Sequence, residues 1–201
     1  MGHKHSKADI LTGALAVAFR DGLSQLTFGR VAKHLGISDR IVVYYFPTKD
    51  DLIGEVLSAM GAELQATLAP VFSAPVADHL ELLRSAWPVL ARPAADPVFA
   101  LFFEAGGLAA AGREPFNVIV PHLVEAWIEW AAERLAGTRT RRRAEAEAAI
   151  ALLDGLLLIR QLAGPAVANR AAKRIVGAVS GASNGVLPRP SDSSSHAQIS
   201  R

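Results

Sequence analysis

The fold of this chain is set by residues 27–46, which read TFGRVAKHLGISDRIVVYYF. Thr27 and Ser38 are residue types that accept a hydrogen bond from the first turn of a helix, so each predicts a helix start. Gly36 lies between them and can take the left-handed conformation that ends a helix. The stretch therefore predicts two short helices joined by a tight turn, the layout of a helix-turn-helix. An ordinary corner between two helices of an all-α protein would have the same spacing.

The second of these helices carries the side chains that DNA recognition requires. Val42 is expected to face inward, which leaves polar and aromatic side chains on the outer face. Two turns of helix with exposed arginine and tyrosine fit a major groove about 12 Å wide. The candidates for this outer face are Ser38, Asp39, Arg40, Tyr44 and Tyr45.

Helical periodicity continues on both sides, and the sequence shows no extended strand pattern. An apolar stripe over residues 10–18 predicts a first helix, which Gly22 ends in the left-handed conformation. Pro47 ends the third helix, and Thr48 caps a long fourth helix that reaches about Leu68. Further helices are expected at residues 76–91, 96–110, 115–136, 141–163 and 166–180. The predicted fold class is all-α, with an N-terminal three-helix helix-turn-helix module and a larger helical body.

The composition fits a globular protein with a substantial core. The 201 residues are 51% hydrophobic and 20% charged, and they include no cysteine. No apolar run is long enough to span a membrane, and the start of the chain is polar. We therefore expect a soluble cytoplasmic protein without membrane contact, and without a disulfide or a thiolate metal site. No metal or cofactor is expected.

The net charge of +2 is unevenly distributed. Residues 1–50 contain seven Lys/Arg against four Asp/Glu, whereas residues 51–201 contain fourteen against fifteen. A basic N-terminal module on a nearly neutral body suggests an anionic partner for the module. Chance scatter of a few charges would explain the difference equally well.

Large aromatic residues gather in the middle of the chain, between Leu82 and Trp130. An apolar pocket with few polar anchors is typical of a small-molecule site. The candidate lining residues are Trp87, Phe99, Phe102, Phe103, Phe116, His122 and Trp127. The alternative is a solid core, because aromatic residues at helical spacing are usually core residues.

The helix expected at 141–163 is apolar nearly all round, so two of its sides require a cover. One cover is the core of the same chain, and we expect the other to be a second subunit that forms a four-helix interface. The predicted interface residues are Ala149, Leu152, Leu153, Leu156, Ile159, Ile175 and Val179. Deep burial within one chain is the alternative.

The motif Gly36-Ile-Ser-x-x-x-Val42-x-x-Tyr45-Phe46-x-x-Lys49-x-x-Leu52, preceded by Thr27-x-x-x-Val-Ala, resembles the DNA-binding signature of the TetR family of bacterial transcriptional regulators. The resemblance covers about residues 8–55. It implies a DNA-binding domain at 1–47 and an effector-binding and dimerisation domain at 48–180. We expect the Ser-rich tail at 181–201 to be disordered.

The resemblance also implies roles for individual residues. Thr27 and Arg30 would contact the phosphate backbone, and Lys49 would pair with a phosphate at the start of the fourth helix. The groove side would carry Ser38, Asp39, Arg40, Ile41, Tyr44 and Tyr45. Arg40 is the best candidate for a bidentate bond to guanine. Asp39 would accept from a cytosine amine or simply compensate the helix dipole.

The sequence departs from the family pattern at Val43, where tyrosine is frequent, so one phosphate contact is lost unless Tyr44 replaces it. The basic run at residues 139–143 is expected to be a solvated loop, with a nucleic-acid patch as the alternative.

An enzyme is the rival class of function. The chain lacks the phosphate-binding G-x-x-x-x-G-K motif and the zinc-binding H-E-x-x-H motif, and we expect no catalysis. The resemblance favours a regulator, usually a repressor, that a small and largely apolar or amphipathic effector releases from a palindromic operator. Its expected partners are double-stranded operator DNA, that effector and a second copy of the chain.

Overall fold

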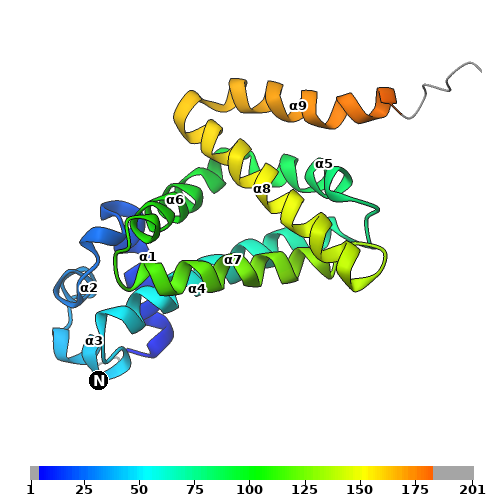
Figure 1. Ribbon diagram of the computed structural model, residues 1–201. Helices are drawn as coiled ribbons and strands as arrows, with labels where there is room; N and C mark the ends of the chain where they lie inside the picture. The colour runs from blue at the N-terminus through cyan, green and yellow to red at the C-terminus, as the bar shows by residue number, and fades with distance from the viewer. Residues whose placement is uncertain (1–4, 183–201) are drawn as a thin grey trace, which may run out of the picture.

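The computed structural model describes residues 5–182, and within this range it contains nine α-helices and no strand (Figure 1). Their bounds are α1 Lys7–Asp21, α2 Phe28–Leu35, α3 Asp39–Tyr45, α4 Lys49–Leu68, α5 His79–Leu90, α6 Asp96–Ala110, α7 Phe116–Ala132, α8 Arg139–Ala163 and α9 Pro165–Ala182. The all-α prediction is confirmed. Helices α1 to α3 form one end of the molecule, and α4 leads from them into the body (Figure 1).

The helix ends of the first module follow local sequence signals. The Thr27 hydroxyl accepts a hydrogen bond from the Arg30 N–H at 3.3 Å and starts α2. Gly36 ends α2 in the left-handed conformation, with φ 68° and ψ 31°. Thr48 starts α4 through a capping box with Asp51, in which each side chain accepts from the other residue's N–H at 3.0 Å. These short-range contacts fix the start of α2, the turn between α2 and α3, and the start of α4.

Two of the expected helix ends differ in detail. Gly22 has a positive φ of 87° but an extended ψ of 161°, so it is not left-handed helical as predicted. Ser38 stands at the start of α3, but its side chain makes no capping hydrogen bond. The Ser38 carbonyl instead accepts from the Ile41 N–H at 3.0 Å. The hydroxyl of Ser38 is therefore left at the exposed end of α3.

The first of two apolar cores joins the N-terminal module to the body. Buried side chains of α1 to α3, such as Ile10 and Phe46, pack with the first half of α4 and with residues from α6 and α7. The contributions from α6 and α7 are Leu101, Ala105, Phe116 and Val120. The division predicted at residues 47 and 48 thus crosses a shared core, and it stays a prediction.

The second core holds the body together. It contains buried side chains of α5, α6, α7, α8 and α9 and the end of α4. Arg160 of α8 is buried beside it and donates from Nε and Nη2 to the Asp96 carboxylate of α6, at 2.6 and 2.9 Å. This bidentate ion pair ties α8 to the start of α6.

The basic run at residues 139–143 forms the first turn of α8, so the prediction of a loop is wrong. The Thr138 hydroxyl caps this helix by accepting from the Arg141 N–H at 3.4 Å. Arg143 pairs with Glu125 of α7 and, at 3.0 Å, with Glu147 one turn later. Within the run, Arg143 is therefore engaged by acidic partners, while Arg139 and Arg141 are exposed.

At the other end of the body, residues 181 and 182 belong to α9, and the rest of the predicted tail lies outside the described residues. Across residues 5–182, none of the helices has both the length and the hydropathy needed to cross a membrane.

Candidate DNA-binding surface and ligand pocket

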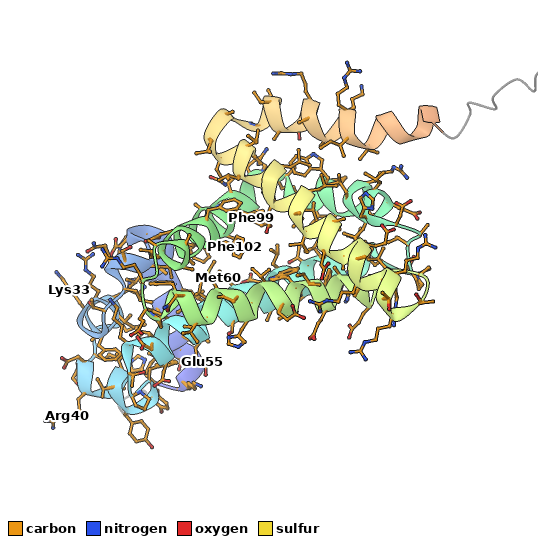
Figure 2. All side chains as sticks on the ribbon, in the orientation of Figure 1. Lys33, Arg40, Glu55, Met60, Phe99 and Phe102 are labelled. Atoms are coloured by element: carbon orange, nitrogen blue, oxygen red, sulfur yellow. The ribbon has the colours of Figure 1, made fainter. Side chains whose placement is uncertain are left out.

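Helix α3 presents a narrow polar and aromatic face to solvent. Val42 and Phe46 are buried and anchor the helix to the first core. The opposite side carries Arg40, which points outward at the end of the molecule in Figure 2, and Tyr44, whose side chain is 78% exposed. A helix with one buried edge and an exposed arginine beside an exposed tyrosine can enter a groove without unfolding.

Five of the six predicted groove-side residues share this exposed face. They are Ser38, Asp39, Arg40, Ile41 and Tyr44. The Asp39 carboxylate accepts a hydrogen bond from the Arg40 N–H at 3.1 Å, as expected for a carboxylate at a helix N-terminus. Val43 also lies on this side and was not among the predicted contacts.

Tyr45 is the exception, because its hydroxyl turns back toward the N-terminus. It donates a hydrogen bond to the His5 carbonyl at 2.9 Å, and its ring is half-buried against the first core. Tyr44 contacts it edge-to-face with the ring centroids 4.9 Å apart. Tyr45 therefore positions α3 against the chain before α1, and the structure places it away from the groove-side face.

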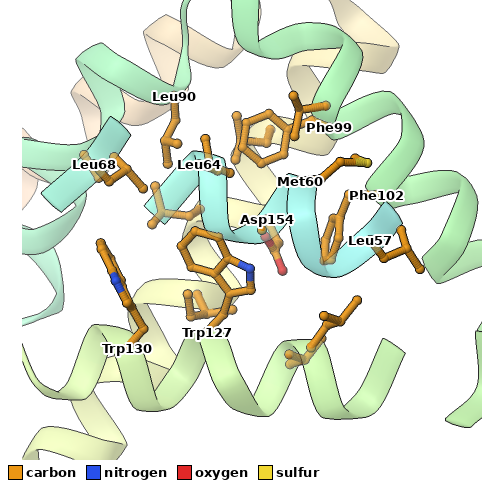
Figure 3. A pocket seen from close by; sticks show the side chains of 18 of the residues that line it. Leu57, Met60, Leu64, Leu68, Leu90, Phe99, Phe102, Trp127, Trp130 and Asp154 are labelled. Atoms are coloured by element: carbon orange, nitrogen blue, oxygen red, sulfur yellow. The ribbon is translucent and has the colours of Figure 1, made fainter. Parts of the chain in front are cut away.

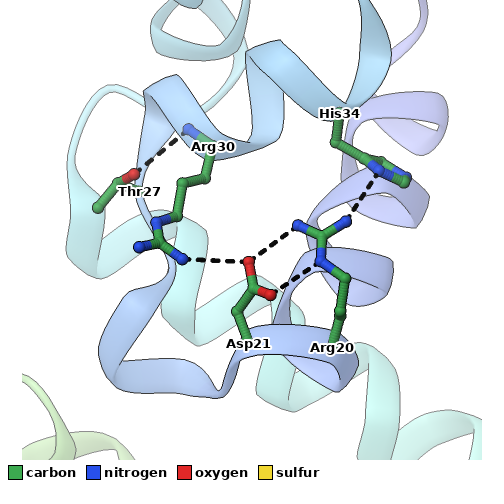
Figure 4. A network of polar contacts seen from close by, with 5 residues as sticks. All are labelled: Arg20, Asp21, Thr27, Arg30 and His34. Atoms are coloured by element: carbon green, nitrogen blue, oxygen red, sulfur yellow. Dashed lines mark hydrogen bonds and ion pairs between the residues drawn. The ribbon is translucent and has the colours of Figure 1, made fainter.

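The predicted phosphate contacts of α2 lie in a polar network at its start (Figure 4). Asp21 accepts from Arg20 at 2.8 Å and from Arg30 at 3.2 Å, and Arg20 also lies 3.5 Å from His34. The hydrogen bond from Arg20, aided by the charges of both arginines, lowers the pKa of Asp21 to about 2. The carboxylate thus stays ionised and orients two exposed guanidinium groups, that of Arg30 near Thr27 and that of Arg20 near His34.

Two more basic residues border the same end of the molecule. Lys49 is exposed at the first residue of α4, as predicted. Lys33 of α2 is exposed and points outward in Figure 2, but the sequence argument did not include it. Its exposure follows from the helical period, since Val31 and Ala32 of the same helix are buried.

A carboxylate of the body holds the turn between α1 and α2. Glu104 of α6 accepts from the Leu23 N–H at 2.9 Å and from the Ser24 N–H and hydroxyl at 2.9 and 2.6 Å. Burial raises the pKa of Glu104, but the hydrogen bonds from Ser24 and Leu23 outweigh it and lower the pKa overall. A Cβ on Gly22 would lie only 3.1 Å from this carboxylate. We call these contacts the Glu104 clasp.

An apolar cavity of about 80 Å³ lies in the body between α4, α5, α6, α7 and α8 (Figure 3). Phe99, Phe102 and Trp127 line it, as the sequence argument predicted. The same helix α6 that carries Phe99 and Phe102 also carries Glu104. The cavity therefore borders the helix that holds the turn between α1 and α2.

The other four predicted lining residues lie outside the cavity. Trp87 donates from its ring N–H to Asn169 of α9 at 3.0 Å, and Phe116 is buried in the first core. Phe103 packs behind Phe102, with the ring centroids 5.6 Å apart. His122 is exposed, and its Nδ1 lies 2.8 Å from the Val118 carbonyl oxygen of its own helix.

The predicted lining residues include none from α4 and omit the one charged group that lines the cavity. Leu57, Met60 and Leu64 of α4 line it, although their spacing predicted only an inward-facing stripe. Asp154 of α8 also lines it, and burial raises the pKa of this carboxyl to about 6. In the sequence, the signal that could have pointed to Asp154 is that it stands as a lone charge in a long apolar run.

The predicted dimer face is largely turned into the protomer itself. Ala149, Leu153 and Leu156 are buried in the second core, while Leu152 and Ile175 are half-buried against it. Of the predicted residues on α8, Ile159 is the most exposed, at 40%. The side chain of Val179 lies outside the described residues. Helices α5, α6 and α7 supply the cover that had been assigned to a second subunit.

A different apolar stripe of α8 and α9 remains uncovered. Leu158 is 40% exposed and Leu162 75% exposed, and Val167 of α9 continues the stripe beside Ile159. Gly155 lies one turn before Leu158 with open space above it. We refer to Gly155, Leu158, Ile159, Leu162 and Val167 as the α8–α9 face.

Comparison with known proteins agrees with the fold and the N-terminal module. The family model described as bacterial regulatory proteins, tetR family, matches residues 10–56. A comparison with curated protein sequences gave no significant match.

Solved structures match over most of the chain. A transcriptional regulator from Rhodococcus sp. is 22% identical, with a TM-score of 0.68 over 89% of this chain and 97% of that one. A TetR transcriptional regulator from Legionella pneumophila is 20% identical, with a TM-score of 0.59 over 89% and 99%. The multidrug binding protein EbrR, in complex with proflavin, is 24% identical, with a TM-score of 0.59 over 84% and 98%.

The matched segment spans α1 to α3 and the start of α4, which are the elements that carry the exposed groove-side face. The predicted resemblance is confirmed: residues 10–56 match the model of the bacterial regulatory proteins of the tetR family, and the chain shares the fold of solved transcriptional regulators over most of its length.

Proposed function

We propose that this protein is a transcriptional repressor that binds a palindromic operator as a homodimer and is released by a small, largely apolar effector. The observation that carries the proposal is the exposed face of α3 on a module that shares its core with the ligand-lining helices. The operator side would use α3 in the major groove, with Arg40 on a guanine. Thr27, Arg30 and Lys49 would hold phosphates on either side.

The α8–α9 face is the proposed dimer interface. Leu158, Ile159 and Leu162 are large apolar side chains that solvent contacts in the single chain. Pairing α8 and α9 with their symmetry mates would bury them in a four-helix arrangement, and Gly155 would allow close approach of the helices. A dimer built this way places two α3 helices on one side of the DNA.

The cavity among α4 to α8 is the proposed effector site. The structures of EbrR with proflavin and with malachite green support a ligand site in a protein of this fold. In this chain the lining helix α6 also carries the Glu104 clasp. A ligand that displaces α6 would therefore pull on the turn before α2 and change the spacing of the two α3 helices. The ligand can switch the protein only if it binds one of the two arrangements more tightly than the other.

Separate roles for Arg40 and Lys49 give the first test. Arg40→Ala should cost roughly 1–3 kcal/mol of operator binding and relax the preference at one base pair in each half-site. Lys49→Ala should weaken binding to all duplexes equally. Because each dimer loses two phosphate contacts, the slope of log affinity against log salt should become shallower by about 2 units. Salt titrations on a selected palindrome and on random duplex measure both effects.

Two outcomes would contradict this docking. One is an unchanged salt slope for Lys49→Ala. The other is equal loss of specific and random DNA for Arg40→Ala. Tyr45→Phe is a control for these variants and should leave DNA binding unchanged, because the Tyr45 hydroxyl bonds to His5 and does not face the groove.

The Glu104 clasp gives the second test. Glu104→Ala removes the acceptor for two backbone N–H groups, so the Leu23 and Ser24 amide protons should exchange with solvent at least tenfold faster. The free energy of unfolding should fall by about 1–2 kcal/mol, since the clasp is partly exposed to water. Exchange measured by NMR tests the first effect, and urea unfolding tests the second.

Glu63→Ala is the control for this variant, because Glu63 is an exposed glutamate of α4. Its unfolding free energy should stay within about 0.5 kcal/mol of the parent value. Unchanged exchange at Leu23 and Ser24 in Glu104→Ala would show that the clasp does not hold the module.

A further inference from the structure

Asp154 is an isolated charge in an apolar space. It lies in the middle of α8, and its carboxyl group points into the cavity that Figure 3 shows. Among the described residues it makes no hydrogen bond and no ion pair. Other acidic residues of the body do have partners: Asp96 pairs with Arg160, Glu125 with Arg143, and Glu104 with the turn before α2.

The lining offers nothing that could neutralise this carboxylate. The side chains that α4, α5, α6 and α7 contribute are aliphatic or aromatic, and Asp154 is the one titratable residue among those that line the cavity. Asp154 is half-buried, and a charge that loses hydration without gaining a partner is costly. Burial accordingly raises the pKa of this carboxyl.

Aromatic rings surround the same space. Phe99 and Phe102 of α6 and Trp127 of α7 line it together with Asp154. The faces of aromatic rings attract cations, and tryptophan does so most strongly. The neighbouring Trp130 already uses its face in this way, because the guanidinium carbon of Arg134 lies 3.4 Å from its ring centroid. Trp127 has no such partner among the described residues.

We propose that the cavity selects a cationic ligand, an aromatic or branched hydrocarbon frame that carries one protonated amine, with Asp154 as its counter-ion. The apolar lining takes the frame, the carboxylate takes the ammonium group, and the aromatic rings contact both. A charge-assisted hydrogen bond in a dry site is stronger than one between neutral groups, so the charge of the ligand decides affinity. This inference rests on the proposed function, because it names the class of effector that the proposed regulator would bind.

A charge series on the unmodified protein tests the proposal without any mutation. The probes are isobutylamine, isobutanol and isobutyric acid, which share one small branched hydrocarbon frame suited to a cavity of about 80 Å³ and are cationic, neutral and anionic at pH 7.5. Calorimetric titration should show the amine binding at least tenfold more tightly than the alcohol, and the acid most weakly. Equal affinities of amine and alcohol would overturn the proposal, and so would failure of the amine to bind.

Two variants of α8 then locate the effect. Asp154→Asn keeps the size of the side chain but removes its charge, so the amine and the alcohol should bind within threefold of each other. Glu147→Gln is the matched control, because Glu147 lies on the exposed side of α8 and pairs with Arg143. It should keep the full preference for the amine. A preference that survives in Asp154→Asn would place the counter-ion elsewhere.

Operator binding separates this inference from the function it rests on. If the protein binds a selected operator but shows no preference for the amine, the ligand class is wrong and the regulator remains. If no operator can be selected, the proposed function fails, whatever the cavity binds.

Discussion

Replacing Leu158 and Leu162 with arginine should convert the protein to a monomer that binds operator DNA at least a hundredfold more weakly. Both side chains are exposed in the single chain, so the charges should not disturb the fold itself. In a dimer they would meet their own copies across the two-fold axis, where uncompensated charges are costly. A lone module also loses the gain from binding two half-sites at once. Sedimentation velocity and a DNA titration measure the two effects.

Val118→Arg is the matched control for this double variant. Val118 is an exposed apolar residue, at 56%, but it lies at the start of α7, outside the α8–α9 face. The control should keep the mass and the DNA affinity of the parent protein. A dimeric Leu158→Arg/Leu162→Arg protein, or a monomeric parent at micromolar concentration, would show that the subunits do not meet at this face.

Asp154→Asn should stabilise the folded protein at neutral pH. The folded pKa of Asp154 is about 6 and its ordinary value is 3.8, so the folded state binds the proton more tightly than the unfolded state. The parent protein therefore loses stability as the pH rises from 4 to 6 and carries the full penalty at pH 7.5. The asparagine side chain does not titrate, so the variant lacks this loss of stability. We expect a gain of about 2 kcal/mol at pH 7.5, after allowing for partial solvation, that vanishes below pH 4.

Urea unfolding of the parent and of Asp154→Asn at pH 4 and pH 7.5 measures this difference. Comparing the two proteins at each pH cancels the titration of all other groups that the substitution does not touch. A difference in unfolding free energy that is the same at both pH values would mean that the carboxyl is not desolvated. A stabilised variant without a preference for cationic ligands would show that Asp154 is retained for binding rather than for folding.

The helix ends of the N-terminal module were predictable because they depend on neighbours in sequence. Thr27 and Thr48 each accept from the N–H three residues on, and the conformation of Gly36 is a property of the residue itself. The helices at residues 49–68 and 96–110 have the predicted bounds, the first with a side-chain cap at Thr48 and the second without one. Such signals act over one helical turn, so no knowledge of the tertiary packing is needed.

The faces of the helices could not be assigned in the same way. Helix α8 is apolar nearly all round, so its sequence does not tell which stripe faces the protomer core. Leu153 and Leu156 turned out to face inward, and Leu158 and Leu162 outward, because α5, α6 and α7 occupy one side. The place of Tyr45 is also decided by tertiary packing. Only its contact with His5, forty residues away in sequence, shows that its side chain does not face the groove.

The pocket was predicted only in part. The spacing of aromatic residues located the lining side chains of α6 and α7 but not those of α4. Phe102 and Phe103 are adjacent in sequence, yet a rotation of about 100° between them puts one in the cavity and the other behind it. Asp154 was visible as a lone charge in an apolar run. Its meaning depends on the empty space beside it, which packing creates and sequence does not show.

The most direct test of the proposed function is selection of binding sites from a random pool of duplex DNA by the purified protein, followed by sedimentation of the enriched complex. The proposed function predicts a palindrome whose half-sites are about one helical turn, roughly 34–36 Å, or a multiple of it apart, bound by two chains. Arg40→Ala should lose the enrichment. A pool that stays random, or a site without two-fold symmetry bound by one chain, would contradict the proposed function.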